Sequence, residues 1–123
     1  MQKPGSPFPA RALASSKGGR TDLAEIFGKG TTIVAVLPAE PTAAHFDALQ
    51  LRYPGWLLTH FFNVYLVSAA KPEEARRWAD TYGLQAAILH DDSGDITAHP
   101  GVYRVTDGNI ERAAGFDALD TLV

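Results

Sequence analysis

A chain of 123 residues is long enough to bury one hydrophobic core, and its 46% apolar and 20% charged residues are typical of a globular protein. The formal net charge of −3 gives no basic surface for nucleic acid or anionic lipid, and no apolar run approaches the ~20 residues of a membrane span. The chain contains no cysteine, which excludes disulfides, thiolate nucleophiles and zinc sites with cysteine ligands.

The chain begins with residues 1–7, which hold two of the eight prolines. We expect these residues to form a loose arm, followed by one domain over residues 8–123. The N-terminal stretch MQKPGSPFPARALASSKGG has no apolar segment of the kind that a secretory signal requires. We therefore expect the protein to be cytoplasmic.

The segment after the arm predicts short elements. Phe8 to Ala14 favours a short strand, and the proline within it favours an edge position. Lys17 to Arg20 favours a turn. Either Thr21 or Asp22 is then expected to cap a short helix that ends at Gly28.

Two apolar segments predict the central strands of a sheet. Thr31 to Leu37 is β-branched and apolar on both faces, which is typical of a buried strand, and Pro38 ends it. Val64 to Val67 predicts a second strand of the same kind.

A helix is expected between these two strands. Thr42 is its expected cap, and apolar residues at spacings of three and four form one face of it. The residues of that face are Phe46, Leu49 and Tyr53. Pro54-Gly55 interrupts the helix, and Trp56 to Phe62 fits either another helical turn or the start of a strand.

The second half of the chain predicts a further helix, a short strand and a hairpin. Lys71 to Glu74 is typical of a helix start, because it places proline near the first position and acids in the first turn. We expect Gly83 to end this helix. The later elements are a strand over Ala86–Leu89, a turn over Asp91–Gly94, a hairpin of Gly101–Val105 and Ile110–Ala114, and a short helix over Phe116–Leu122. The acidic run Asp91 to Asp95 lacks the spacing and the distal glutamate of a calcium loop.

This order of elements predicts an α/β fold with a central mixed β-sheet and helices on both faces. It resembles the thioredoxin-like three-layer sandwich, and the N-terminal extension resembles the peroxiredoxin (alkyl hydroperoxide reductase and thiol-specific antioxidant) family. Three segments carry the resemblance in chain order: FPARALASSKGGRTDLAEIFGKGTTIVAVL, VLPAEPTAAHF and HPGVYRVTDGNI.

The second segment matches the spacing of the peroxiredoxin motif P-x-x-x-T-x-x-C. Pro38 and Thr42 fall on its proline and threonine, and His45 stands where the peroxidatic cysteine would be. Pro100 in the third segment falls on the cis-proline position of thioredoxins, so a cis peptide bond is one expectation there. The resemblance also implies an arginine beside the site, for which either His99 or Arg104 is the nearest candidate.

The missing cysteine removes the chemistry that this resemblance would otherwise imply. Imidazole does not form a sulfenic acid that a thiol can recycle, so His45 does not replace the peroxidatic thiolate. Thiol peroxidase activity and disulfide exchange are therefore excluded. We predict a redox-inactive, non-catalytic binding or assembly module whose partner is a second copy of the chain or another protein.

The alternative is a ligand- or metal-binding protein, or an enzyme, that uses the vacated cysteine pocket. The candidate residues for that pocket are Pro38, Thr42, His45, His99, Pro100 and Arg104. A neutral His45 could serve there as a ligand or a base, but a polar side chain that simply fills the pocket is the plainer interpretation. No H-x-x-x-H or H-E-x-x-H spacing is present, so we expect neither a metal nor another cofactor.

An aromatic-rich stretch is a candidate for a contact surface. It contains Trp56, Phe61, Phe62 and Tyr65. Packing around the second central strand is the simpler interpretation, and an exposed patch used for dimerisation is the alternative.

Overall fold

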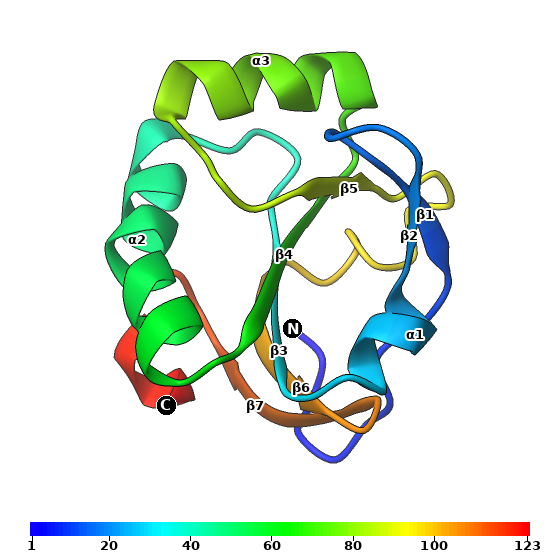
Figure 1. The fold of residues 1–123 in the computed structure, drawn as a ribbon, viewed down its shortest axis with the longest axis vertical. Helices are drawn as coiled ribbons and strands as arrows, with labels where there is room; N and C mark the ends of the chain where they lie inside the picture. The colour runs from blue at the N-terminus through cyan, green and yellow to red at the C-terminus, as the bar shows by residue number, and fades with distance from the viewer.

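The computed structural model describes residues 1–123 as one mixed sheet of seven strands with helices against it (Figure 1). The strands lie in the order β2-β1-β5-β4-β3-β6-β7. They are β1 (Ala12–Ser15), β2 (Arg20–Asp22), β3 (Thr32–Val36), β4 (Asn63–Ser68), β5 (Ile88–His90), β6 (Gly101–Thr106) and β7 (Asn109–Ala114). The helices are α1 (Leu23–Phe27), α2 (Ala43–Pro54) and α3 (Pro72–Tyr82), with a π-helix η1 (Gly55–Thr59) and a 3₁₀-helix η2 (Leu119–Leu122).

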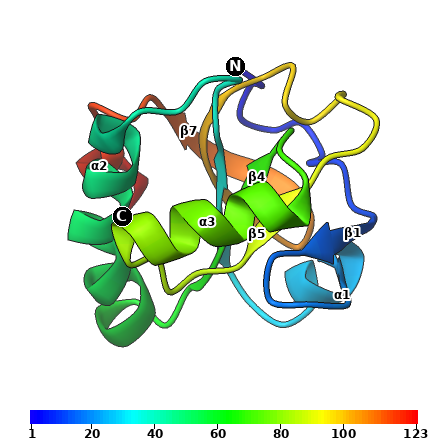
Figure 2. The same cartoon turned by 90° about the horizontal axis from the view of Figure 1, so that it is seen from above.

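The connections between the central strands explain the layers. Strand β4 runs parallel to β3 and to β5, whereas β6 runs antiparallel to β3. Helix α2 connects β3 to β4, and helix α3 connects β4 to β5. Both connections step in the same direction along the sheet, and such crossovers are right-handed, so the two helices lie on the same face of the sheet. Helix α1 covers the other face, as Figures 1 and 2 show. The predicted α/β fold, with a central mixed sheet between helical layers, is confirmed.

Strand β3 divides the hydrophobic core into two parts. All five of its residues are buried, and successive side chains point to opposite faces. Ile33 and Ala35 pack on the side of α2 and α3. Val34 and Val36 pack on the side of α1. The continuous apolar run in the sequence therefore corresponds to a strand that is covered on both faces.

Side-chain and backbone chemistry fixes the helix ends where the sequence predicts them. Asp22, not Thr21, caps α1, because its carboxylate accepts a hydrogen bond from the Ala24 N–H at 3.0 Å. Gly28 follows α1 as its C-cap. Gly83 ends α3 in the left-handed conformation, with a φ of 66° that favours glycine.

The N-terminal strand differs from the prediction. It covers Ala12–Ser15 instead of Phe8 to Ala14, and β2 pairs on its outer side, so β1 is not at the edge of the sheet. Phe8 is nevertheless buried, with its ring against the rings of Phe27 and Tyr103. An apolar residue can thus join the core from outside a strand, and that is why apolar pattern alone misplaced this strand.

The first residues lie along the β6–β7 hairpin, although the sequence predicts a loose arm. The Gly5 N–H donates to the Ile110 carbonyl at 2.7 Å, and the Ile110 N–H donates to the Ser6 carbonyl at 2.9 Å. The Gln2 N–H donates to the Tyr103 hydroxyl at 2.9 Å. These hydrogen bonds bring the N-terminus close to the start of β6.

Helix α2 extends through Pro54 and continues as the π-helix η1. A proline has no N–H to donate to the carbonyl four residues earlier, so the regular α-helical pattern cannot continue through it. The following turn is wider, with the His60 N–H donating to the Gly55 carbonyl at 3.1 Å. The segment Trp56 to Phe62 therefore begins as a helical turn, and Phe61, with a φ of 57°, redirects the chain into β4. None of the helices combines the length and the hydropathy that a membrane span requires.

Candidate functional site

The predicted pocket lies where β3 ends, α2 begins and β6 begins. Val36 pairs with Gly101 across β3 and β6, which places the residues that follow one strand beside those that precede the other. A hollow of about 180 Å³ opens at this point. Its lining includes three of the six predicted residues, Pro38, His45 and Pro100, together with Met1, Gly101, Gly115 and Phe116.

The side chain of His45 caps helix α2. Its Nδ1 accepts a hydrogen bond from the Thr42 N–H at 2.9 Å and lies 3.1 Å from the Thr42 hydroxyl oxygen. The ring packs edge-on against Phe116, with centroids 4.9 Å apart and planes at 81°. His45 thus occupies the position that Glu or Gln holds in a capping box.

This hydrogen bond decides what His45 can do chemically. A backbone N–H can only donate, so Nδ1 must be the unprotonated nitrogen of a neutral imidazole. A neutral imidazole has one such nitrogen, and Nε2 therefore carries the hydrogen. In this arrangement the Thr42 N–H engages Nδ1, and Nε2 is the ring nitrogen that remains to donate a hydrogen bond. No group of three His, Asp or Glu side chains lies close enough together to hold a metal ion.

The other predicted residues do not complete a site around His45. The side chain of His99 is exposed and does not line the hollow, while its carbonyl accepts a hydrogen bond from the Tyr103 hydroxyl at 2.8 Å. The peptide bond before Pro100 is trans, because the chain has no cis peptide bond, so the expectation of a cis bond there is wrong.

Arg104 lies away from the hollow, three residues further along β6 and opposite Ile33. One of its guanidinium nitrogens donates to the Leu122 carbonyl at 3.2 Å, and its guanidinium carbon lies 5.4 Å from the centre of the Phe62 ring. Its Nε is 3.6 Å from a carboxylate oxygen of Glu111 and has no hydrogen-bond partner. Arg104 therefore ties the C-terminal helix η2 to the sheet.

Replacing His45 with alanine is expected to lower the free energy of unfolding by ~1 kcal/mol, because the Thr42 N–H loses its acceptor. Urea denaturation monitored by circular dichroism measures this loss. His45→Gln is the matched control, since a glutamine at this position can accept the same hydrogen bond and should recover most of the stability. Equal losses in both variants would contradict the capping role.

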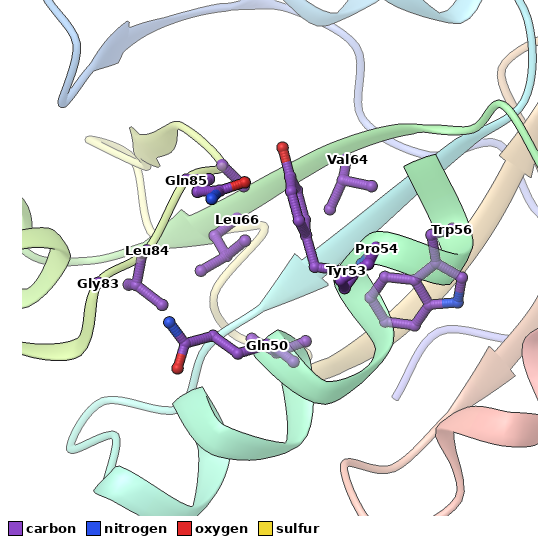
Figure 3. Close-up of a pocket in the computed structure, with 11 residues that line it drawn as sticks. Gln50, Tyr53, Pro54, Trp56, Val64, Leu66, Gly83, Leu84 and Gln85 are labelled. Carbon is purple, nitrogen blue, oxygen red and sulfur yellow. The ribbon is translucent and has the colours of Figure 1, made fainter. Parts of the chain in front are cut away.

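A second hollow, which sequence analysis did not identify, lies between α2, β4 and the segment that joins α3 to β5 (Figure 3). It measures about 120 Å³, and seven of its 11 lining residues are hydrophobic. Leu49, Trp56 and Leu66 form buried walls, whereas Tyr53 is only half-buried. The predicted apolar face of α2 contained Leu49 and Tyr53, but no sequence signal indicated a gap beside them.

Residues 4–116 match the AhpC/TSA family. Among solved structures, a proposed protein disulfide isomerase from Bacteroides thetaiotaomicron matches with a TM-score of 0.79 and 13% identity, over 98% of this chain and 85% of that one. Peroxidoxin BcpB from Mycobacterium tuberculosis matches with a TM-score of 0.76 and 14% identity, over 95% of this chain and 88% of that one.

A cysteine-to-serine variant of PrxQ from Xylella fastidiosa matches with a TM-score of 0.76 and 12% identity, over 99% of this chain and 94% of that one. No curated protein matches the chain. At such low identity the solved structures establish a shared fold and say nothing of shared chemistry. The thioredoxin-like three-layer sandwich that the sequence predicts is therefore confirmed.

Proposed function

The chain belongs to the AhpC/TSA family, and we propose that it acts there as a non-catalytic module that binds a second copy of itself. The observation that carries this proposal is the loss of the nucleophile. The chain holds no cysteine, and His45, which stands in its place, uses its one unprotonated nitrogen to cap α2. This use of Nδ1 supports a structural role for His45 in place of a nucleophile or a base.

The proposed contact is an apolar surface at the C-terminal end of α2, formed by Leu51, Leu58, Phe61 and Val123 and here called the assembly patch. The exposed fractions of the first three residues are 77%, 70% and 83%. Leu51 lies in the last turn of α2, and Leu58 lies in η1, which continues α2 directly. Helix η2 contacts α2 and brings the C-terminus beside it (Figure 1). Large apolar side chains gathered in this way are typical of a protein–protein interface.

The charges beside the assembly patch favour a second copy as the partner. Arg52 and Asp120 line the same shallow hollow as Leu51 and Val123. Neither Arg52 nor Asp120 forms an ion pair within the chain. In a two-fold symmetric dimer each copy presents the same surface to the other, so Arg52 of one copy can face Asp120 of its partner.

The alternative function is a ligand-binding pocket around His45, Thr42 and His99. The Nε2–H of His45 beside the 180 Å³ hollow favours it, since that group can donate to a bound molecule. Two observations weigh against it. His99 does not line the hollow, and the unprotonated nitrogen of His45 is already used by Thr42.

Native mass spectrometry and sedimentation velocity at micromolar concentration test the assembly proposal. We expect the wild-type chain to form dimers and Phe61→Asn to dissociate them, with a dissociation constant at least about tenfold higher. Asparagine tolerates the positive φ of Phe61, so this change removes the ring without straining the backbone.

His45→Ala is the matched control and should dimerise like the wild type. A chain that stays monomeric at high concentration would contradict the proposal. Consumption of peroxide by the purified chain with a thiol donor would overturn its non-catalytic part. A small bound mass that is lost in His45→Ala would favour the alternative pocket.

A further inference from the structure

We propose that the hollow behind Tyr53 is a binding site for a small uncharged molecule about the size of one aromatic ring, with a single hydroxyl or carbonyl group. The inference goes beyond the proposed function, because this hollow is distinct from both the His45 hollow and the assembly patch. None of its 11 lining residues carries a charge. An ionic ligand would therefore lose its hydration there without gaining a partner.

The walls of the hollow belong to the hydrophobic core. Leu49, Trp56, Leu66 and Ala86 are each less than a tenth exposed and are members of the core cluster beneath α2 and α3. An apolar molecule that enters the hollow therefore extends the core itself. Each contact that it makes with the walls adds a dispersion interaction that is missing while the hollow is empty.

The size of the hollow limits the ligand to a single ring or an equivalent apolar group. Its volume is about 120 Å³. An engineered protein cavity of about 150 Å³ with apolar walls stays dry and binds benzene. The present hollow is slightly smaller but opens to solvent, so a substituted ring can sit with its substituent at the mouth.

Local structure keeps the hollow open. The side-chain amide of Gln50 donates to the Tyr82 carbonyl at the end of α3, which fixes the distance between α2 and the segment that follows α3. Pro54 begins the wider π-helical turn that carries Trp56 into the wall. Single-turn π-helices are frequent at functional sites. Ala86 stands at a position where a larger side chain would fill the space.

Polar groups at the mouth match one hydrogen-bonding group on the ligand. The Tyr53 hydroxyl and the Gln85 side-chain amide form no hydrogen bond within the protein. Figure 3 shows the Tyr53 ring standing between Gln85 and Val64, with its hydroxyl at the end of the ring away from Gln50. The Tyr53 hydroxyl and the Gln85 amide can each donate and accept a hydrogen bond, so they fit a ligand hydroxyl or carbonyl equally well.

Titration of the full chain with p-cresol, followed by ¹H–¹⁵N correlation spectra, tests the site. We expect amide shifts confined to the residues around the hollow, with a dissociation constant on the order of 1 mM for a ligand of this size. Benzoate, a charged ring of similar size, should bind at least about tenfold more weakly. The absence of p-cresol shifts, or equal binding of benzoate, would overturn the proposal.

Ala86→Phe fills the hollow from inside and should abolish p-cresol binding while leaving the dimer unchanged. Ala69→Phe adds the same ring at an exposed position and should leave binding unchanged. If Ala86→Phe fails to fold, Leu84→Trp at the half-buried rim blocks entry instead. Wild-type affinity in a folded blocking variant would show that p-cresol binds elsewhere and would overturn the assignment. Because the dimer is measured separately, failure of this site and failure of the assembly proposal are distinguishable.

Discussion

Replacing Asp91 with alanine is expected to lower the free energy of unfolding by about 3 kcal/mol. The side chain of Asp91 is fully buried. One carboxylate oxygen accepts from the Ile96 N–H at 3.0 Å, the Thr97 N–H at 2.9 Å and the Thr97 hydroxyl at 3.1 Å. The other accepts from the Arg11 guanidinium at 2.8 Å. Alanine would leave the buried Ile96 N–H and the partly buried donors of Thr97 and Arg11 without this acceptor, and would release the loop that leads into β6.

The electrostatics of this carboxylate give the loss a pH dependence. Burial alone would raise the pKa of Asp91, but hydrogen bonds from Thr97 and the charge of Arg11 outweigh burial and hold that pKa below its ordinary value of 3.8. Such a group contributes stability above its unfolded pKa and loses it as the pH falls through the lower folded pKa. The wild type should therefore lose stability below about pH 4, and Asp91→Ala should lose less over the same range.

Urea denaturation between neutral pH and pH 3 measures both effects. Asp92→Ala is the matched control, because Asp92 is exposed and forms no hydrogen bond or ion pair through its side chain; its loss should stay within about 0.5 kcal/mol. Losses of equal size in the two variants would contradict the role assigned to Asp91. So would an acid profile of Asp91→Ala as steep as that of the wild type.

The elements that sequence analysis predicted best are those whose signals are local. The run that became β3 is apolar on both faces because the strand is covered on both faces, so pattern and burial agree. Helix α3 begins at Pro72 and ends at a left-handed Gly83, and both residues fit those positions through backbone geometry alone. The hairpin turn at Asp107-Gly108 has positive φ at both residues, as two-residue hairpin turns require.

The features that sequence analysis missed depend on contacts between distant residues. The run from Asp91 to Asp95 fits an exposed turn, yet Arg11, 80 positions away, makes Asp91 the buried centre of a network. Arg104 was one of two candidates for the arginine that the resemblance implies beside the cysteine pocket, but its place on β6 aims it at Phe62 and Leu122. The hollow beside Tyr53 exists only because α2, β4 and the α3–β5 segment meet without filling the space between them.

The candidate site combines a local sequence pattern with a contact that the sequence alone does not reveal. The spacing of Pro38, Thr42 and His45 predicted a strand end, a helix cap and the position of the missing nucleophile, and the structure gives the cap to Thr42 and His45 together. The spacing could not reveal which nitrogen of His45 is used. That point depends on the direction of one backbone N–H, which places Nδ1 of His45 in the cap of α2.

Replacing Phe46 with alanine is expected to lower the free energy of unfolding by about 4 kcal/mol, the largest loss that we predict for a single change. The side chain of Phe46, a residue of α2, is fully buried. Its ring stacks on Tyr82 with centroids 4.6 Å apart and lies 5.7 Å from the Trp78 ring, so it joins α2 to α3. Alanine removes both aromatic contacts and leaves a cavity that neighbouring side chains fill only in part.

Thermal and urea denaturation of Phe46→Ala measure this loss, with Asp47→Ala as the exposed neighbour on the same helix, for which we expect a change within about 0.5 kcal/mol. The variant also separates the two hollows. Phe46 follows His45 directly in the chain, but its ring faces α3, so loosening this contact should weaken p-cresol binding beside Tyr53 while the Thr42–His45 cap persists. Unchanged p-cresol affinity in a destabilised Phe46→Ala would mean that the α2–α3 contact does not shape the hollow. A loss in the free energy of unfolding below about 2 kcal/mol would mean that neighbouring side chains fill the cavity left by the Phe46 ring.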